Sequence, residues 1–181
     1  FSYGIVNAHN GCLHLEVVVR GKIAHAALPH QGHDALEAAH TILSALYEHR
    51  RGLSTQVSAV PGIESPTMVV GLISGGVNTN VVPEAVSFRV DRRIIPEEDP
   101  TAVESNLRNL IAESVIYLPG IHCEVNRLVL ARALAPLPGH EKLKLEIARH
   151  GERVFGEAIP TYGVPLYTDA RHYAEAGIPT V

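Results

Sequence analysis

Two stretches in which apolar and polar side chains alternate constrain the fold of this chain more than any other feature. In residues 12–20, leucines and valines occupy every second position, and in residues 86–93 valine and phenylalanine alternate with charged residues. A period of two is typical of a β-strand that turns one face to a core and the other to water. Both stretches are therefore predicted to be half-buried strands of one antiparallel sheet.

Two predicted helices separate these strands from two others. Apolar residues recur at helical spacing over residues 35–51, after a capping Asp34, and again after Pro100. Further strands are predicted at residues 67–74 and 121–125. The order strand, helix, strand, strand, helix, strand predicts an α+β fold, a ferredoxin-like two-layer sandwich with two helices on one sheet face. Such a sheet has a free edge, which predicts a homodimer.

The remaining residues, 128–181, follow a different pattern. A linker-like stretch precedes a charged helix at residues 141–155, a short strand, and a helix that Asp169 would cap and Gly177 would end. Residues 178–181 are predicted to begin a buried strand. Since the chain starts at Phe1 and this last layer is unfinished, we expect a fragment of a longer protein. Its expected parts are a domain over 12–127 and an incomplete α/β segment over 128–181.

Composition excludes several classes of partner. The formal net charge of −4 gives no electrostatic reason to bind nucleic acid or an anionic membrane. No apolar run approaches the ~20 residues of a membrane span. Cys12 and Cys123 lie far apart, and the eleven histidines form no His-x-His or His-Glu-x-x-His pattern. Free thiols in a reducing cytoplasm are the favoured interpretation.

Three short motifs go beyond a generic sandwich. The first runs from Gly21 to His25 and on to Pro29. The second runs from Gly75 through Asn80 to Pro83 and leads into a strand that ends at Arg93. The third contains Thr168, Asp169 and Arg171, followed by Gly177-Ile178-Pro179. In this order and spacing, the chain resembles the zinc metallopeptidase family of acetylornithine deacetylase, succinyl-diaminopimelate desuccinylase, aminoacylase and glutamate carboxypeptidase.

The resemblance implies a role for each motif. Residues 12–127 would be the lid and dimerisation domain of a hydrolase that uses two zinc ions to cleave an amide bond of an N-acyl amino acid or small peptide. His25 would enter the partner subunit's active site and donate a hydrogen bond to the oxyanion. Asn80 would hold the substrate, Arg93 would bind its carboxylate, and Thr168 and Arg171 would belong to a substrate-contacting loop. The family's metal ligands match no residue here, so the fragment is expected to bind no metal and to be inactive alone.

Simpler interpretations remain open for each residue. His25 could be a loop histidine bonded to backbone, Asn80 a turn residue, and Arg93 the partner of Asp91 in a surface ion pair. Thr168 and Arg171 could be a helix cap and a solvated charge. The whole chain could then be a stand-alone ferredoxin-like module for dimerisation or small-ligand binding. A nucleic-acid-binding sandwich is less favoured, because its central strands would carry exposed aromatic residues.

Overall fold

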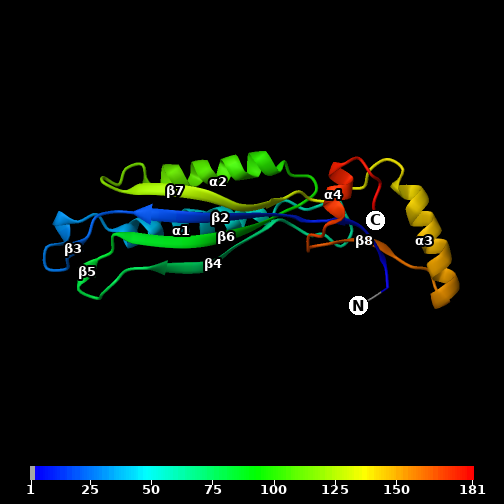
Figure 1. Cartoon of the computed structure of the whole chain (residues 1–181), viewed down its shortest axis with the longest axis horizontal. Coiled ribbons are helices and arrows are strands. Elements are labelled where there is room, and N and C mark those ends of the chain that lie inside the picture. Colours follow the sequence, from blue (N-terminus) through cyan, green and yellow to red (C-terminus); the bar gives the residue numbers. More distant parts are fainter. Residues whose placement is uncertain (1–2) are drawn as a thin grey trace.

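The computed structural model describes residues 3–181 (Figure 1). The strands and helices, in chain order, are β1 (Ile5–His9), β2 (Gly11–Arg20), β3 (Ala24–His25), the 3-10 turn η1 (Pro29–Gln31), α1 (Ala35–Leu53), β4 (Thr67–Gly75), β5 (Val81–Val82), β6 (Ala85–Ile94), α2 (Pro100–Val115), β7 (His122–Ala131), α3 (His140–Phe155), β8 (Thr161–Val164) and α4 (Ala170–Glu175).

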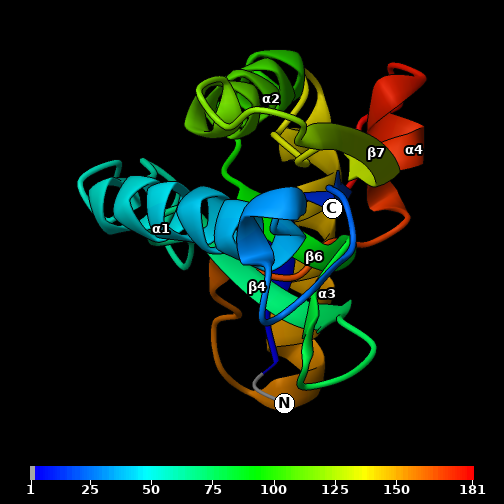
Figure 2. The same cartoon turned by 90° about the vertical axis from the view of Figure 1, so that its left-hand side faces the viewer.

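The main sheet has four strands in the order β4-β6-β2-β7, and every neighbouring pair is antiparallel. Helices α1 and α2 lie together on one side of it (Figure 2). The predicted α+β fold with an antiparallel sheet and two covering helices is therefore confirmed. Strands β4 and β7 form the two edges of the sheet.

The core lies between this sheet and its two helices. Leu15, Val17 and Phe88 are almost fully buried on the sheet side, and Ile42 and Ile111 are equally buried on the helix side. Truncating such a residue to alanine typically costs about 2–5 kcal/mol, because a cavity remains.

Both covering helices begin at an aspartate cap. Asp34 Oδ1 accepts hydrogen bonds from the amides of Leu36 (2.8 Å) and Glu37 (3.1 Å), as the sequence predicted. Asp99 accepts from Thr101 and Ala102 in the same way. Each aspartate satisfies amide groups that otherwise lack a partner in the first helical turn.

Outside the main sheet and its two helices, the structure differs from the prediction in three ways. Strand β1 was not predicted, because its sequence does not alternate; it pairs in parallel with β8. Residues 178–181 form no strand, and Ile178 is half exposed, so the predicted buried strand was wrong. Asp169 makes no side-chain cap at α4; the hydroxyl of Thr168 accepts from the amide of Ala170 instead, at 3.2 Å.

Among residues 3–181, no helix combines the length and the apolar character needed to cross a membrane.

Candidate functional site

His25 and Asn80 lie together at one end of the main sheet. Strands β3 and β5 form a small antiparallel pair in which His25 lies opposite Val81. The amide of Ala26 donates to the carbonyl oxygen of Asn80 at 2.9 Å. Both His25 and Asn80 are exposed. The sequence predicted only turns at residues 75–84, so this pairing was missed, and it brings two of the predicted site residues together.

A backbone contact defines the proton position on His25. The amide of Ala27 donates to Nδ1 of the ring at 3.1 Å. Because Nδ1 acts as the acceptor, the proton of the neutral imidazole lies on Nε2. This nitrogen is then a hydrogen-bond donor on an exposed side chain.

Arg93 lies at the other end of the sheet and is bound by an acid. Its Nε is 3.0 Å from Asp91 Oδ1, and its Nη2 donates to Asp91 Oδ2 at 3.1 Å. The ion pair foreseen in the simpler interpretation therefore exists. His14, directly opposite Asp91 on β2, places its Nε2 3.0 Å from the same Oδ2.

The third motif lies beside Arg93. The guanidinium of Arg93 stands over the ring of Tyr167, 5.7 Å from its centre. Tyr167 precedes Thr168, whose amide donates to His9 Nε2 at 3.4 Å. Nδ1 of His9 donates to the carbonyl of Asn10, so the ring is a neutral tautomer with both nitrogens engaged. Burial is the main reason that the pKa of His9 is lowered, and the positive charge of Arg171 also lowers it.

Two groups of predicted site residues thus occupy opposite ends of the sheet. Strands β2 and β6 pair over ten residues, from Gly11 opposite Ile94 to Arg20 opposite Ala85. Arg93 is at the first end, and His25 and Asn80 lie beyond the second. At ~3.4 Å per residue, the ends are separated by about 30 Å. Side chains of one chain cannot meet across that distance.

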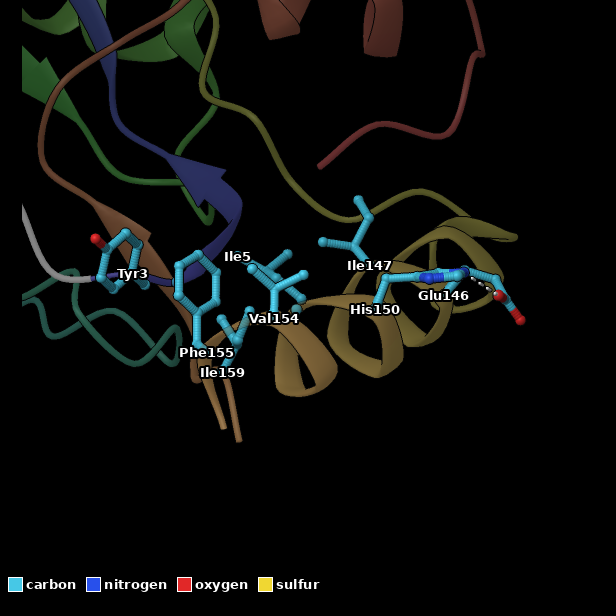
Figure 3. Close-up of a pocket in the computed structure, with 10 residues that line it drawn as sticks. Tyr3, Ile5, Glu146, Ile147, His150, Val154, Phe155 and Ile159 are labelled. Carbon is cyan, nitrogen blue, oxygen red and sulfur yellow. Dashed lines mark ion pairs between the residues drawn. The ribbon is translucent and has the colours of Figure 1, made fainter. Parts of the chain in front are cut away.

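A large cavity lies elsewhere. It has a volume of about 710 Å³ and is formed mainly by apolar residues of α3 and the start of the chain (Figure 3). Ile147, Val154 and Phe155 line it from α3, and Ile5 lines it from β1. None of the predicted site residues lines it. Its apolar walls are typical of a packing surface rather than of a site for a charged substrate.

One group of side chains in the described part of the chain has the composition of a metal site. Ligand atoms of Cys12, His14 and Asp91 lie within 4.8 Å of one another. However, Asp91 is paired with Arg93, and burial raises the pKa of the Cys12 thiol to about 11. Three ligand atoms, one of them from a carboxylate already paired with a guanidinium, are too few for a centre of two zinc ions.

Comparison with known proteins identifies the family. Residues 7–116 match the model of the M20 peptidase dimerisation domain. The chain belongs to the M20 peptidase family. The matched residues begin within β1 and end just after α2, so they contain most of the main sheet and both covering helices.

The curated relatives include acetylornithine deacetylases. This M20 chain is 30% identical over 178 residues to the enzyme of Myxococcus xanthus, covering 97% of the chain and 45% of that protein. It is 31% identical over 138 residues to the enzyme of Vibrio vulnificus, covering 75% of the chain and 35% of that protein. The chain therefore spans less than half the length of these relatives.

Solved structures share the fold at lower identity. An aminopeptidase PepT from Bacillus cereus superposes with a TM-score of 0.75 at 23% identity, covering 99% of this chain and 45% of that one. A tripeptidase from Staphylococcus aureus gives a TM-score of 0.74 at 22% identity, with the same two coverages. At these identities, the likeness concerns the fold alone.

Sequence reasoning missed three residues of the Arg93 neighbourhood. Tyr167, His14 and His9 were not among the site residues predicted from the sequence. The sequence does carry a signal for His14. His14 lies on the polar face of one predicted strand, and Asp91 lies on the polar face of another. Its position directly opposite Asp91 depends on register, which the sequence does not give.

Proposed function

We propose that the parent protein is a metal-dependent hydrolase that cleaves an amide bond of an N-acyl amino acid or small peptide, and that this chain supplies dimerisation and substrate recognition. The separation of His25 from Arg93 is the main support. A complete site would need the Arg93 end of one chain and the His25 end of another. A dimerisation domain can bring two such ends together.

The edge strand β4 supplies a geometry for this dimer. Val69, Leu72 and Ile73 on β4 are each more than half exposed, and apolar side chains on a free edge favour pairing. In the ladder with β6, Thr67 lies opposite Arg93 and Gly75 lies opposite Val86. If β4 pairs antiparallel with its own copy about Gly71, the Gly75 end of each chain meets the Thr67 end of the other. His25 and Asn80 of one chain then approach Arg93 of its partner.

Each residue has a defined task in such a composite site. Arg93 would bind the substrate carboxylate, with Thr168 and Arg171 on the adjacent turn and helix as further polar contacts. From the partner, the Nε2–H of His25 would donate to the oxygen that becomes negative when the amide carbonyl is attacked. The amide group of Asn80, beside it, would hold the substrate carbonyl or carboxylate.

The metal ions would be held by parts of the parent outside this chain. We propose 12–127 as the lid domain and 128–181 as part of the α/β catalytic domain, to which β1 and β8 also contribute a two-stranded parallel pair. Parallel sheets are normally covered on both faces, so the apolar wall of α3 and β1 in Figure 3 would pack against the remainder of that domain. Two zinc ions and a cytoplasmic location remain part of this proposal.

The test uses the full-length parent and an N-acetyl amino acid as substrate. We expect acetate release, and we expect Arg93→Ala to raise KM for the free acid about 100-fold with little change in kcat. The matched substrate is the N-acetyl amino acid α-amide, for which the same variant should behave like the natural protein. Absence of hydrolysis with a range of N-acyl amino acids and dipeptides would favour a non-catalytic dimerisation module.

A further inference from the structure

The carboxylate of Asp91 lies at the centre of a small ionic network on the open face of the sheet. Asp91 and Arg93 are two residues apart on β6, so they share a face. His14 reaches the same carboxylate from β2, where it stands directly opposite Asp91. The side chains of all three are about one third exposed, at 33% for His14, 32% for Asp91 and 28% for Arg93.

The two contacts between Asp91 and Arg93 use one particular edge of the guanidinium. Asp91 Oδ1 faces Nε at 3.0 Å, and Oδ2 accepts from Nη2 at 3.1 Å. A guanidinium has five N–H groups and can form a second parallel fork through Nη1 and the other Nη2 hydrogen. Asp91 therefore occupies the lateral edge of the guanidinium through one hydrogen bond at Nη2 and a charge contact at Nε, where its Oδ1 accepts no hydrogen bond. The terminal fork remains suited to a second carboxylate.

Two further contacts restrict the guanidinium. His14 donates from Nε2 to Asp91 Oδ2, which holds the carboxylate in the orientation that Arg93 requires. The ring of Tyr167 lies under the guanidinium, 5.7 Å from ring centre to Cζ. An unrestrained arginine side chain loses rotamer freedom on binding, and these contacts remove much of that freedom in advance.

We propose that Asp91, held by His14, is a positioning residue that orients Arg93 so that its terminal fork receives the substrate carboxylate. The proposal rests on the proposed function. The negative charge of Asp91 also repels a bound carboxylate, so orientation and repulsion oppose each other. We expect the orienting effect to outweigh the repulsion. The guanidinium lies between the two carboxylates, and solvent screens their repulsion at this partly exposed site.

The experiment compares Asp91→Asn, Arg93→Ala and the double variant in the full-length parent, with an N-acetyl amino acid and its α-amide as paired substrates. Asp91→Asn should raise KM for the free acid about tenfold and leave kcat and the α-amide kinetics nearly unchanged. In the Arg93→Ala background, Asp91→Asn should have little further effect, because a double-mutant cycle isolates the coupling between the two residues. Asp91→Glu, which retains a carboxylate, should recover part of the loss.

The control is another ion pair of the same two strands. Glu16 on β2 pairs with Arg89 on β6 at 3.0 Å, and Glu16→Gln should leave KM unchanged. An unchanged or lower KM for Asp91→Asn, together with a raised KM for Arg93→Ala, would overturn the positioning role while leaving the carboxylate clamp intact. An unchanged KM for Arg93→Ala would instead reject the proposed function of the clamp. Equal losses on acid and amide substrates would assign Asp91 a merely structural role.

Discussion

Arg92 and Glu98 form an ion pair at the edge of the core, with Arg92 Nη2 2.5 Å from Glu98 Oε1. The side chain of Arg92 is only 2% exposed and that of Glu98 is 14% exposed. Glu98 also accepts a hydrogen bond from the amide of Ile95 at 3.0 Å. The pair therefore joins the end of β6 to the loop that leads into α2. Arg92 points into the core side while its neighbours Asp91 and Arg93 point to the open face, as strand geometry requires.

Replacing Glu98 by alanine should strongly destabilise the chain. The substitution leaves the buried guanidinium of Arg92 without its countercharge, which typically costs about 3–5 kcal/mol. Urea unfolding measures the loss. The control is Glu48→Ala, since Glu48 and Arg51 form an ion pair in which both side chains are more than 70% exposed, and its removal should change the free energy of unfolding by less than about 1 kcal/mol. Equal effects of the two variants would contradict the burial argument.

Acidification should lower the free energy of unfolding through two histidines. Burial lowers the pKa of His9 below the ordinary value of 6.5, and partial desolvation together with the charge of Arg92 lowers the pKa of the more exposed His49. The unfolded chain therefore binds these protons at a higher pH than the folded chain. The stability that they contribute is complete above about pH 6.5 and is lost progressively as the pH falls toward the folded-state values.

Urea unfolding from about pH 5 to about pH 8 checks this slope. The double variant His9→Asn, His49→Asn should show a weaker pH dependence than the natural chain. His40→Asn is the control for the loss of an exposed histidine from the same helix. Identical pH profiles for the natural chain and the double variant would contradict the prediction.

The dimer should depend on the β4 edge. Leu72 and Ile73 are each more than half exposed there. Placing a lysine on an edge strand discourages pairing with another chain, so Leu72→Lys with Ile73→Lys should give a monomer in sedimentation velocity at micromolar concentration. Leu128→Lys, on the opposite edge strand β7, is the matched control and should leave the dimer intact. A dimer that persists in the β4 variant would exclude this edge as the interface.

The fold was predictable to the extent that each element has its own local signal. The alternation around Leu15 and Phe88, the cap at Asp34 and the helix start at Pro100 predicted the strands and helices of the main sheet. Strand β1 carries no such signal, because its burial depends on a parallel partner 155–156 residues away in β8. Parallel pairing between distant segments is set by tertiary packing rather than by local sequence.

The sequence proposed a set of site residues but not their arrangement. Nothing local to His25 or to Asn80 indicates that β3 and β5 pair, and nothing local to Arg93 indicates that Tyr167 lies beneath it. The division into two groups about 30 Å apart follows from the register of β2 with β6. This separation of the two groups supports a site shared between two chains.

Mixing two inactive or impaired variants of the parent should therefore restore activity. His25→Ala should lower kcat by about 100- to 1000-fold, because it removes a donor to the oxyanion. Arg93→Ala should lower kcat/KM through KM. In a mixed dimer, one composite site combines the intact Arg93 of the first variant with the intact His25 of the second. Random exchange of equal amounts should give about a quarter of the natural kcat/KM, since half of the dimers are mixed and each has one complete site.

The control mixes His25→Ala with Asn80→Ala. The contact between Ala26 and Asn80 places both substituted residues at the same end of the chain, so a mixed dimer contains no complete site and activity should not recover. Exchange is verified by mass-tagged subunits, and activity is measured with substrate well below KM. If His25→Ala and Arg93→Ala fail to complement after verified exchange, the histidine does not act across the dimer. Recovery in the Asn80 control as well would show that His25 and Asn80 of one chain act in two different sites. That result would contradict their placement together by the pairing of β3 with β5.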